Sequence, residues 1–99
     1  MIHFVLLSKQ NPKHYTQPMY QTIGEDISII GIYDHAHFKP KKMQWHQQVF
    51  PVDQICSTHD FKDGAGKKRR FSIMSGKTLY LIEFNRDRET WTLQQVWVE

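Results

Sequence analysis

The chain has 99 residues, enough for one domain with a modest core and too few for a second catalytic domain. The formal net charge is only +3, and the single cysteine, Cys56, excludes an internal disulfide. The apolar run over residues 1–7 is too short to cross a membrane and lacks the pattern of a signal peptide. We therefore expect a cytoplasmic protein with no membrane partner.

Short strands and one long loop are predicted for the first part of the chain. Residues 2–7 are predicted to form a strand, and residues 11–25, which are polar and contain two prolines, a long loop. Apolar side chains then occupy both faces of a strand over residues 26–33, in which Gly31 indicates a bulge or bend. We expect this extended segment to end at Pro40.

The middle of the chain is predicted to turn back at residues 46–48. A strand follows over residues 49–55, and because Pro51 cannot donate a hydrogen bond to a neighbour, this strand is placed at a sheet edge or at a bulge. Residues 58–70 are expected to form a polar connection that turns at residues 63–66.

The last third of the sequence predicts an antiparallel meander. Its strands are residues 71–74, 78–84 and 91–98, and Gly76 supplies the positive φ that the first tight turn requires. The middle strand is apolar on both faces, which predicts that it is covered twice. With no sustained helical periodicity, the chain is expected to be all-β: a single domain over residues 1–99 with five or six strands in a curled antiparallel sheet, as an open barrel or a compact sandwich.

Four segments in order carry a resemblance: Gln44–Ile55, Phe71–Ile73, Tyr80–Ile82 and Trp91–Val96. Over this part the chain resembles a group of small uncharacterised bacterial all-β domains, in which a Trp hairpin leads to a strand with spaced aliphatic residues and a Tyr strand precedes a Trp-x-Leu strand. The resemblance implies a fold and no activity. The group has Gly in the Trp hairpin where this chain has Gln47.

Positive charge is concentrated in two clusters of the central region, Lys39-x-Lys41-Lys42 and residues 67–70. If both clusters meet at one rim of the sheet, they would follow a phosphate backbone while Trp45, Phe71 or Tyr33 stacks on bases. We therefore expect a non-enzymatic, cofactor-free, nucleic-acid-binding accessory domain. The predicted contact residues are Lys41, Lys42, Trp45, Lys67, Lys68, Arg69 and Arg70.

Three alternatives stay open. The basic residues are also typical of solvated loops and of edge strands protected against pairing. The C-terminal strand with Trp97 suggests a protein partner or a homodimer. His35 and His37, two residues apart, suggest a metal site if they share one face of a strand. No enzyme is expected, because the Ser, His and Asp of residues 57–60 are sequence neighbours and such neighbours rarely converge as a catalytic triad.

Overall fold

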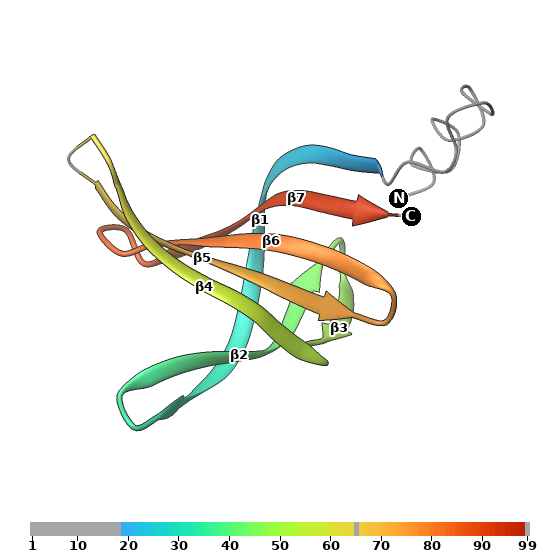
Figure 1. Cartoon of the computed structure of the whole chain (residues 1–99), viewed down its shortest axis with the longest axis horizontal. Coiled ribbons are helices and arrows are strands. Elements are labelled where there is room, and N and C mark those ends of the chain that lie inside the picture. The colour runs from blue at the N-terminus through green and yellow to red at the C-terminus, as the bar shows by residue number, and fades with distance from the viewer. Residues whose placement is uncertain (1–18, 65, 99) are drawn as a thin grey trace.

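The computed structural model describes residues 19–64 and 66–98, which form one seven-stranded antiparallel sheet with the order β3-β2-β1-β7-β6-β5-β4 (Figure 1). The strands are β1 (Met19–Asp34), β2 (His37–Trp45), β3 (Gln48–Pro51), β4 (Gln54–Asp63), β5 (Gly66–Ser75), β6 (Thr78–Asn85) and β7 (Thr90–Val98). The predicted all-β class is confirmed, with seven strands in place of five or six. Within the described ranges there is no helix of the length and apolar character that crossing a membrane requires.

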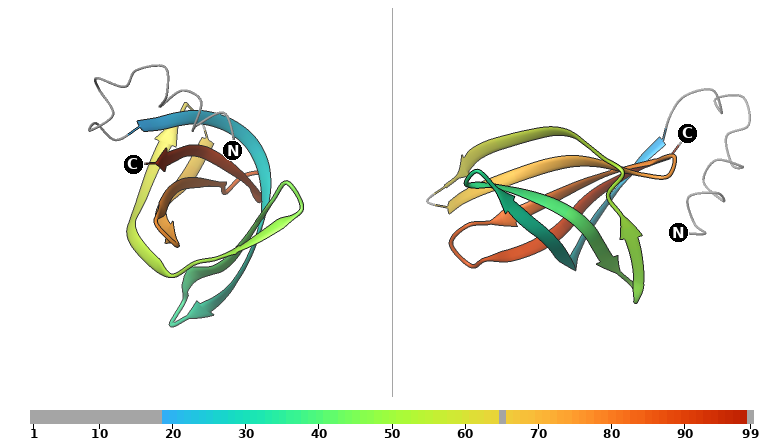
Figure 2. Two further views of the ribbon diagram at one scale, coloured as in Figure 1. Left: turned by 90° about the vertical axis from the view of Figure 1, so that its right-hand side faces the viewer. Right: turned by 90° about the horizontal axis from the view of Figure 1, so that it is seen from below.

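Strand β1 is long because it pairs with two neighbours in turn. Its residues 19–27 pair with β7, and its residues 28–34 pair with β2. The pairing register shifts twice along β1, once at Gly31, where a bulge is predicted from the sequence. Bulges bend a strand and increase its twist. The sheet therefore curls around its inner face into a half barrel (Figure 2).

The short segment between β3 and β4 connects the two ends of the curled sheet through backbone hydrogen bonds. Between β3 and β4, the Val52 amide donates to the Lys41 carbonyl of β2 (2.8 Å), and the Asp53 amide donates to the Met74 carbonyl of β5 (2.8 Å). Beyond this crossing, β4 pairs only with β5, and the first half of β2 pairs only with β1. The barrel therefore stays open along a slot between β2 and β4.

The core fills the inner face of the curl. Alternation along each strand sends every second side chain inward, and the buried apolar residues are Met43, Trp45, Phe71, Ile73, Tyr80, Ile82, Leu93 and Val96. On the outer face of β6, Leu79 and Leu81 are half-buried opposite Trp97 and Gln95 of β7. No second layer covers them in the described part of the chain. The prediction that both faces of β6 are covered is therefore wrong for the outer face, where only neighbours in the same sheet shield these side chains.

The meander of β5, β6 and β7 is confirmed, and Pro51 lies on an edge strand. The single strand predicted over residues 49–55 is wrong, because β3 ends at Pro51 and β4 begins at Gln54, at the opposite edge of the sheet. The predicted loop over residues 11–25 is wrong for residues 19–25, which belong to β1. The hydrogen bonds of the β7 ladder stabilise this polar segment as a strand, and local composition carries no sign of them. The rest of that loop and the strand predicted over residues 2–7 lie outside the described residues.

Pro40 does not end a strand, contrary to the prediction. The chain turns earlier, at His35 and Ala36, and β2 continues through Pro40. Pro40 lies opposite Gly31 at the bulge, on the part of β2 that has one unpaired edge among the described strands. Proline is tolerated at such positions because a missing N–H disrupts no ladder there.

Residues 58–70 also differ from the prediction, because they form most of the long β4–β5 hairpin. The segment is polar because β4 is an edge strand with mostly exposed side chains, and because acidic and basic residues face each other across the hairpin, as Asp60 faces Arg69. The predicted turn between Asp63 and Gly66 is confirmed.

The turn between β2 and β3 is made by two residues that are poorly suited to it. His46 and Gln47 have φ values of 52° and 64°. Positive φ at both central positions is the type I′ geometry, which favours Asn-Gly, and a residue with a Cβ costs about 1 kcal/mol in this region.

Gln47→Gly is therefore expected to raise the free energy of unfolding by about 0.5–1 kcal/mol. Thermal denaturation checks this prediction, with an expected rise in Tm of roughly 2–8 °C. Gln48→Gly is the matched control, because Gln48 lies one residue later on β3 and glycine weakens a strand. Equal changes in Tm for the two variants would contradict the turn assignment.

Candidate nucleic-acid interface

The basic cluster of residues 67–70 lies on β5, where strand alternation divides it between two faces. Lys67 and Arg69 share the inner side with the buried Phe71, whereas Lys68 and Arg70 project from the outer side. The four consecutive cations therefore do not form one continuous surface.

The two outer cations neutralise a buried carboxylate. Glu83 is 6% exposed, and its Oε1 accepts a hydrogen bond from Arg70 Nε (2.8 Å), while Lys68 Nζ lies 3.5 Å from Oε2. Lys68 also donates to Asp63 (3.0 Å), and this hydrogen bond, together with the charge of Glu83, raises the pKa of Lys68. The Arg70 guanidinium covers the Phe61 ring at 4.7 Å. These cations therefore stabilise the sheet, because removing them would leave a buried charge unpaired.

The inner cation Arg69 is held by Asp60 on β4. Arg69 donates from Nε to Oδ1 and from Nη2 to Oδ2, the second bond being 2.9 Å long. This two-point hydrogen bond lowers the pKa of Asp60 and raises the pKa of Arg69. Arg69 therefore has a fixed orientation at the inner edge of the slot.

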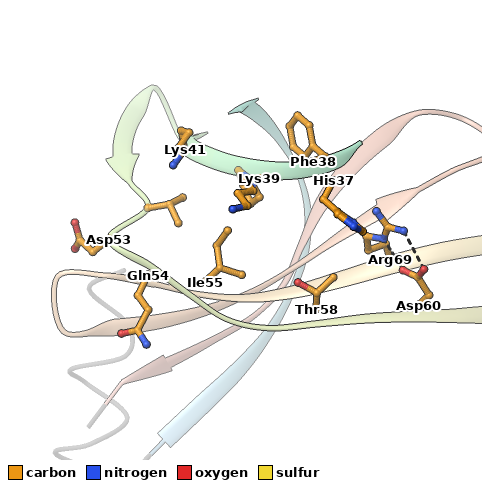
Figure 3. A pocket seen from close by; sticks show the side chains of 12 residues that line it. His37, Phe38, Lys39, Lys41, Asp53, Gln54, Ile55, Thr58, Asp60 and Arg69 are labelled. Atoms are coloured by element: carbon orange, nitrogen blue, oxygen red, sulfur yellow. Dashed lines mark hydrogen bonds and ion pairs between the residues drawn. The ribbon is translucent and has the colours of Figure 1, made fainter. Parts of the chain in front are cut away.

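The slot between β2 and β4 is a hollow of about 740 Å³ (Figure 3). Lys39 and Lys41 line it from β2, and Arg69 lines it from the opposite side. Lys39 donates to Asp34 (3.0 Å), and the side chain of Lys41 is exposed. Two cations of the first basic cluster and one of the second thus line the same slot, which is the part of the predicted rim that forms.

A second hollow, of about 570 Å³, opens at the end of the half barrel where β6 turns into β7. Five aromatic side chains line it: Tyr33, Phe38, Phe71, Phe84 and Trp91. Trp91 is central, with ring centroids 4.8 Å from Phe84, 5.6 Å from Phe71 and 5.7 Å from Phe38. The polar groups at this aromatic hollow are Arg69, Arg86 and Glu89.

The slot and the aromatic hollow are continuous, because Phe38 and Arg69 line both. The aromatic residues come from β1, β2, β5, β6 and β7, so only the curl of the sheet assembles them. Sequence reasoning missed Phe38, Phe84, Trp91, Arg86 and Glu89 as site residues. Their one local signal is that Phe84 and Trp91 face each other next to the turn of a predicted hairpin.

The stacking residues differ from those predicted. Trp45 is 3% exposed, and its indole Nε1–H donates to Glu25 Oε1 (2.9 Å), while Phe71 is 2% exposed. Both rings belong to the core. Trp45 lines neither hollow, so the prediction that it stacks on a base is wrong, whereas Phe71 contributes to the lining of the aromatic hollow although it is almost completely buried. Tyr33, the third candidate, is 77% exposed at the rim of the aromatic hollow and packs edge-on against Phe38 (5.2 Å between centroids).

The predicted contact residues therefore separate into distinct groups. Lys41 and Arg69 line the hollows. Lys42 is exposed on the outer face of β2, opposite Ile30 and Pro51. Lys67 is exposed near the end of the β4–β5 hairpin and lines neither hollow. Lys68 and Arg70 are engaged on the outer face, and Trp45 is buried.

The histidine pair does not have the geometry expected for a metal site. His35 occupies the two-residue turn with φ 54° and hydrogen-bonds Asp34 (2.7 Å), whereas His37 opens β2. The two side chains therefore do not share one face of a strand. Across residues 19–64 and 66–98, no group of three His, Cys, Asp or Glu side chains is arranged to hold an ion.

The C-terminal strand does not offer a free edge. β7 pairs with β1 on one side and with β6 on the other, as far as Trp97 on both sides. The edges of the described sheet are β3 and β4. Self-association by strand pairing through β7 therefore lacks its structural basis, although Trp97 is 40% exposed on the outer face.

No protein-family model matches the chain, and neither a curated protein nor a solved structure matches it. The resemblance to the small bacterial all-β domains stays a prediction. Any functional conclusion depends on the geometry of the two hollows.

Proposed function

We propose that this domain binds single-stranded nucleic acid without catalysing a reaction. An unpaired base stacks in the aromatic hollow, and the adjoining phosphates lie along the slot between β2 and β4. The observation that supports this proposal is the continuity of the two hollows through Phe38 and Arg69. Aromatic platforms beside a cationic track are the common arrangement for binding single strands.

A single strand fits this site better than a duplex. Bases in a duplex are stacked on each other, and their faces are hidden, whereas unpaired bases are free to stack on protein aromatic rings. The rings at this site line a recessed hollow, with Tyr33 exposed at its rim. A recessed platform of this kind is accessible to a base that has left its stack.

The charge around the hollows predicts modest, salt-sensitive affinity. Lys39, Lys41 and Arg86 face the ligand path, while Asp53 and Glu89 reduce the net positive charge there. Two or three phosphate contacts would give a slope of log K against log salt of about −1.4 to −2.1 for a single strand. Fluorescence anisotropy of a labelled single-stranded oligonucleotide at several salt concentrations measures this slope.

Lys41→Glu is expected to weaken oligonucleotide binding about tenfold or more at low salt, because the reversed charge lies at the phosphate track. The matched control is Lys42→Glu, which makes the same charge change one residue away on the outer face. The control is expected to weaken binding by roughly threefold at most, through screened long-range repulsion. Equal losses in the two variants, or no binding by the native domain at low salt, would overturn the proposal.

A further inference from the structure

The polar groups at the aromatic hollow include an anion and a cation from one turn. Arg86 and Glu89 both lie on the connection between β6 and β7. This turn is well defined: the Glu89 amide donates to the Asn85 carbonyl (2.7 Å), and the Asn85 side-chain oxygen accepts from the amides of Asp87 and Arg88 (both 3.0 Å).

The side chains of Arg86 and Glu89 are exposed, and neither forms an ion pair within the described residues. A carboxylate only accepts hydrogen bonds, and its two oxygens suit a pair of adjacent donors. A guanidinium only donates, and it suits a pair of adjacent acceptors. The turn therefore offers both a hydrogen-bond acceptor and a hydrogen-bond donor to a base that enters the hollow.

Guanine has a pair of adjacent donors for the carboxylate and a pair of adjacent acceptors for the guanidinium. Its Watson–Crick edge carries the neighbouring donors N1–H and N2–H, and its O6 and N7 are acceptors that arginine binds in a bidentate manner. Adenine, cytosine and thymine each lack two adjacent donors on the Watson–Crick edge. A carboxylate facing any of them would therefore meet an acceptor, which is unfavourable.

We infer that the aromatic hollow is selective for guanine, with Glu89 accepting from the Watson–Crick edge and Arg86 donating to O6 and N7. This inference rests on the proposed function and gives the base class that the hollow takes. The aromatic rings supply stacking, which any base offers, and Glu89 supplies the discrimination.

The test compares labelled oligothymidylates that carry one central guanine or one central inosine. Inosine lacks only the 2-amino group, so phosphate contacts and stacking stay nearly the same. We expect the guanine strand to bind about tenfold more tightly, the effect of one charge-assisted hydrogen bond. In Glu89→Gln the preference is expected to disappear, because the amide cannot accept from both donors. Arg88→Ala, in the same turn but outside the hollow, is expected to retain the preference.

The outcomes separate the inference from the proposed function. Salt-dependent binding of both strands with equal affinity would overturn guanine selectivity and leave single-strand binding intact. Absence of binding by either strand at low salt would overturn the proposed function. In that case, NMR titration with guanosine and inosine monophosphates decides the inference: a shift of the Trp91 indole signal by the first only supports it, and equal responses overturn it.

Discussion

Trp45→Ala is expected to lower the free energy of unfolding by about 3–5 kcal/mol, the usual range for truncating a buried tryptophan. The Trp45 ring is 3% exposed and packs 6.4 Å from Phe50 between ring centroids. The substitution leaves a cavity and also removes the indole hydrogen bond to Glu25. Urea denaturation followed by circular dichroism measures the loss.

If Trp45→Ala is too unstable to study, two further variants test whether Trp45 belongs to the core. Trp45→Phe keeps an aromatic ring in the core, and once folded it is expected to bind oligonucleotide as the native domain does. Trp97→Ala truncates a 40% exposed side chain, so a clearly smaller loss of stability is expected. Weaker oligonucleotide binding by fully folded Trp45→Phe would contradict the core assignment and restore Trp45 as a contact residue.

Gly31→Ala is expected to destabilise the domain by about 3 kcal/mol, at the upper end of overpacking effects. A Cβ at this position would lie 2.4 Å from the Lys39 carbonyl oxygen and 2.5 Å from Phe38 Cζ. The carbonyl belongs to the paired backbone of β2, so it moves only if the bulge moves. Because Phe38 lines both hollows, the same substitution is expected to weaken oligonucleotide binding.

Gly64→Ala is the control for this prediction. Gly64 has φ 63°, and a Cβ added there would have no atom of the described residues within 4 Å beyond its chain neighbours. Alanine at this position therefore adds backbone strain of about 1 kcal/mol and no collision. Thermal denaturation of both variants separates collision from strain. A loss for Gly31→Ala no larger than that for Gly64→Ala would show that β1 and β2 are not held as closely as the structure has them.

Local sequence patterns were sufficient to predict those structural features whose physical cause lies within a few consecutive residues. The runs of β-branched and aromatic residues in β5, β6 and β7, the positive φ at Gly76 and the edge or bulge position that Pro51 indicates are all properties of a few consecutive residues. These features predicted the meander and the all-β class. The turn between β4 and β5 was predicted, but the two strands beside it were missed because their polar side chains are stabilised across the strands, as Arg69 is by Asp60.

The candidate site was predictable only in part. The sequence indicated where positive charge accumulates, but Lys68 and Arg70 are occupied by Glu83, which is 15 and 13 residues away along the chain. No local pattern distinguishes a lysine that faces a buried carboxylate from one that faces solvent. The same holds for Trp45, whose burial follows from the curl of the sheet around it.

By itself, the sequence determined the strands of the meander, because strand-forming side chains and turn chemistry act between near neighbours. The tertiary structure alone decided which side chains share a surface. Phe38 of β2 packs against Trp91 of β7, and shares one hollow with Phe84 of β6, only because the bulges of β1 curl the sheet. A binding surface depends on such long-range closure, whereas a strand depends mainly on its own residues and their immediate partners.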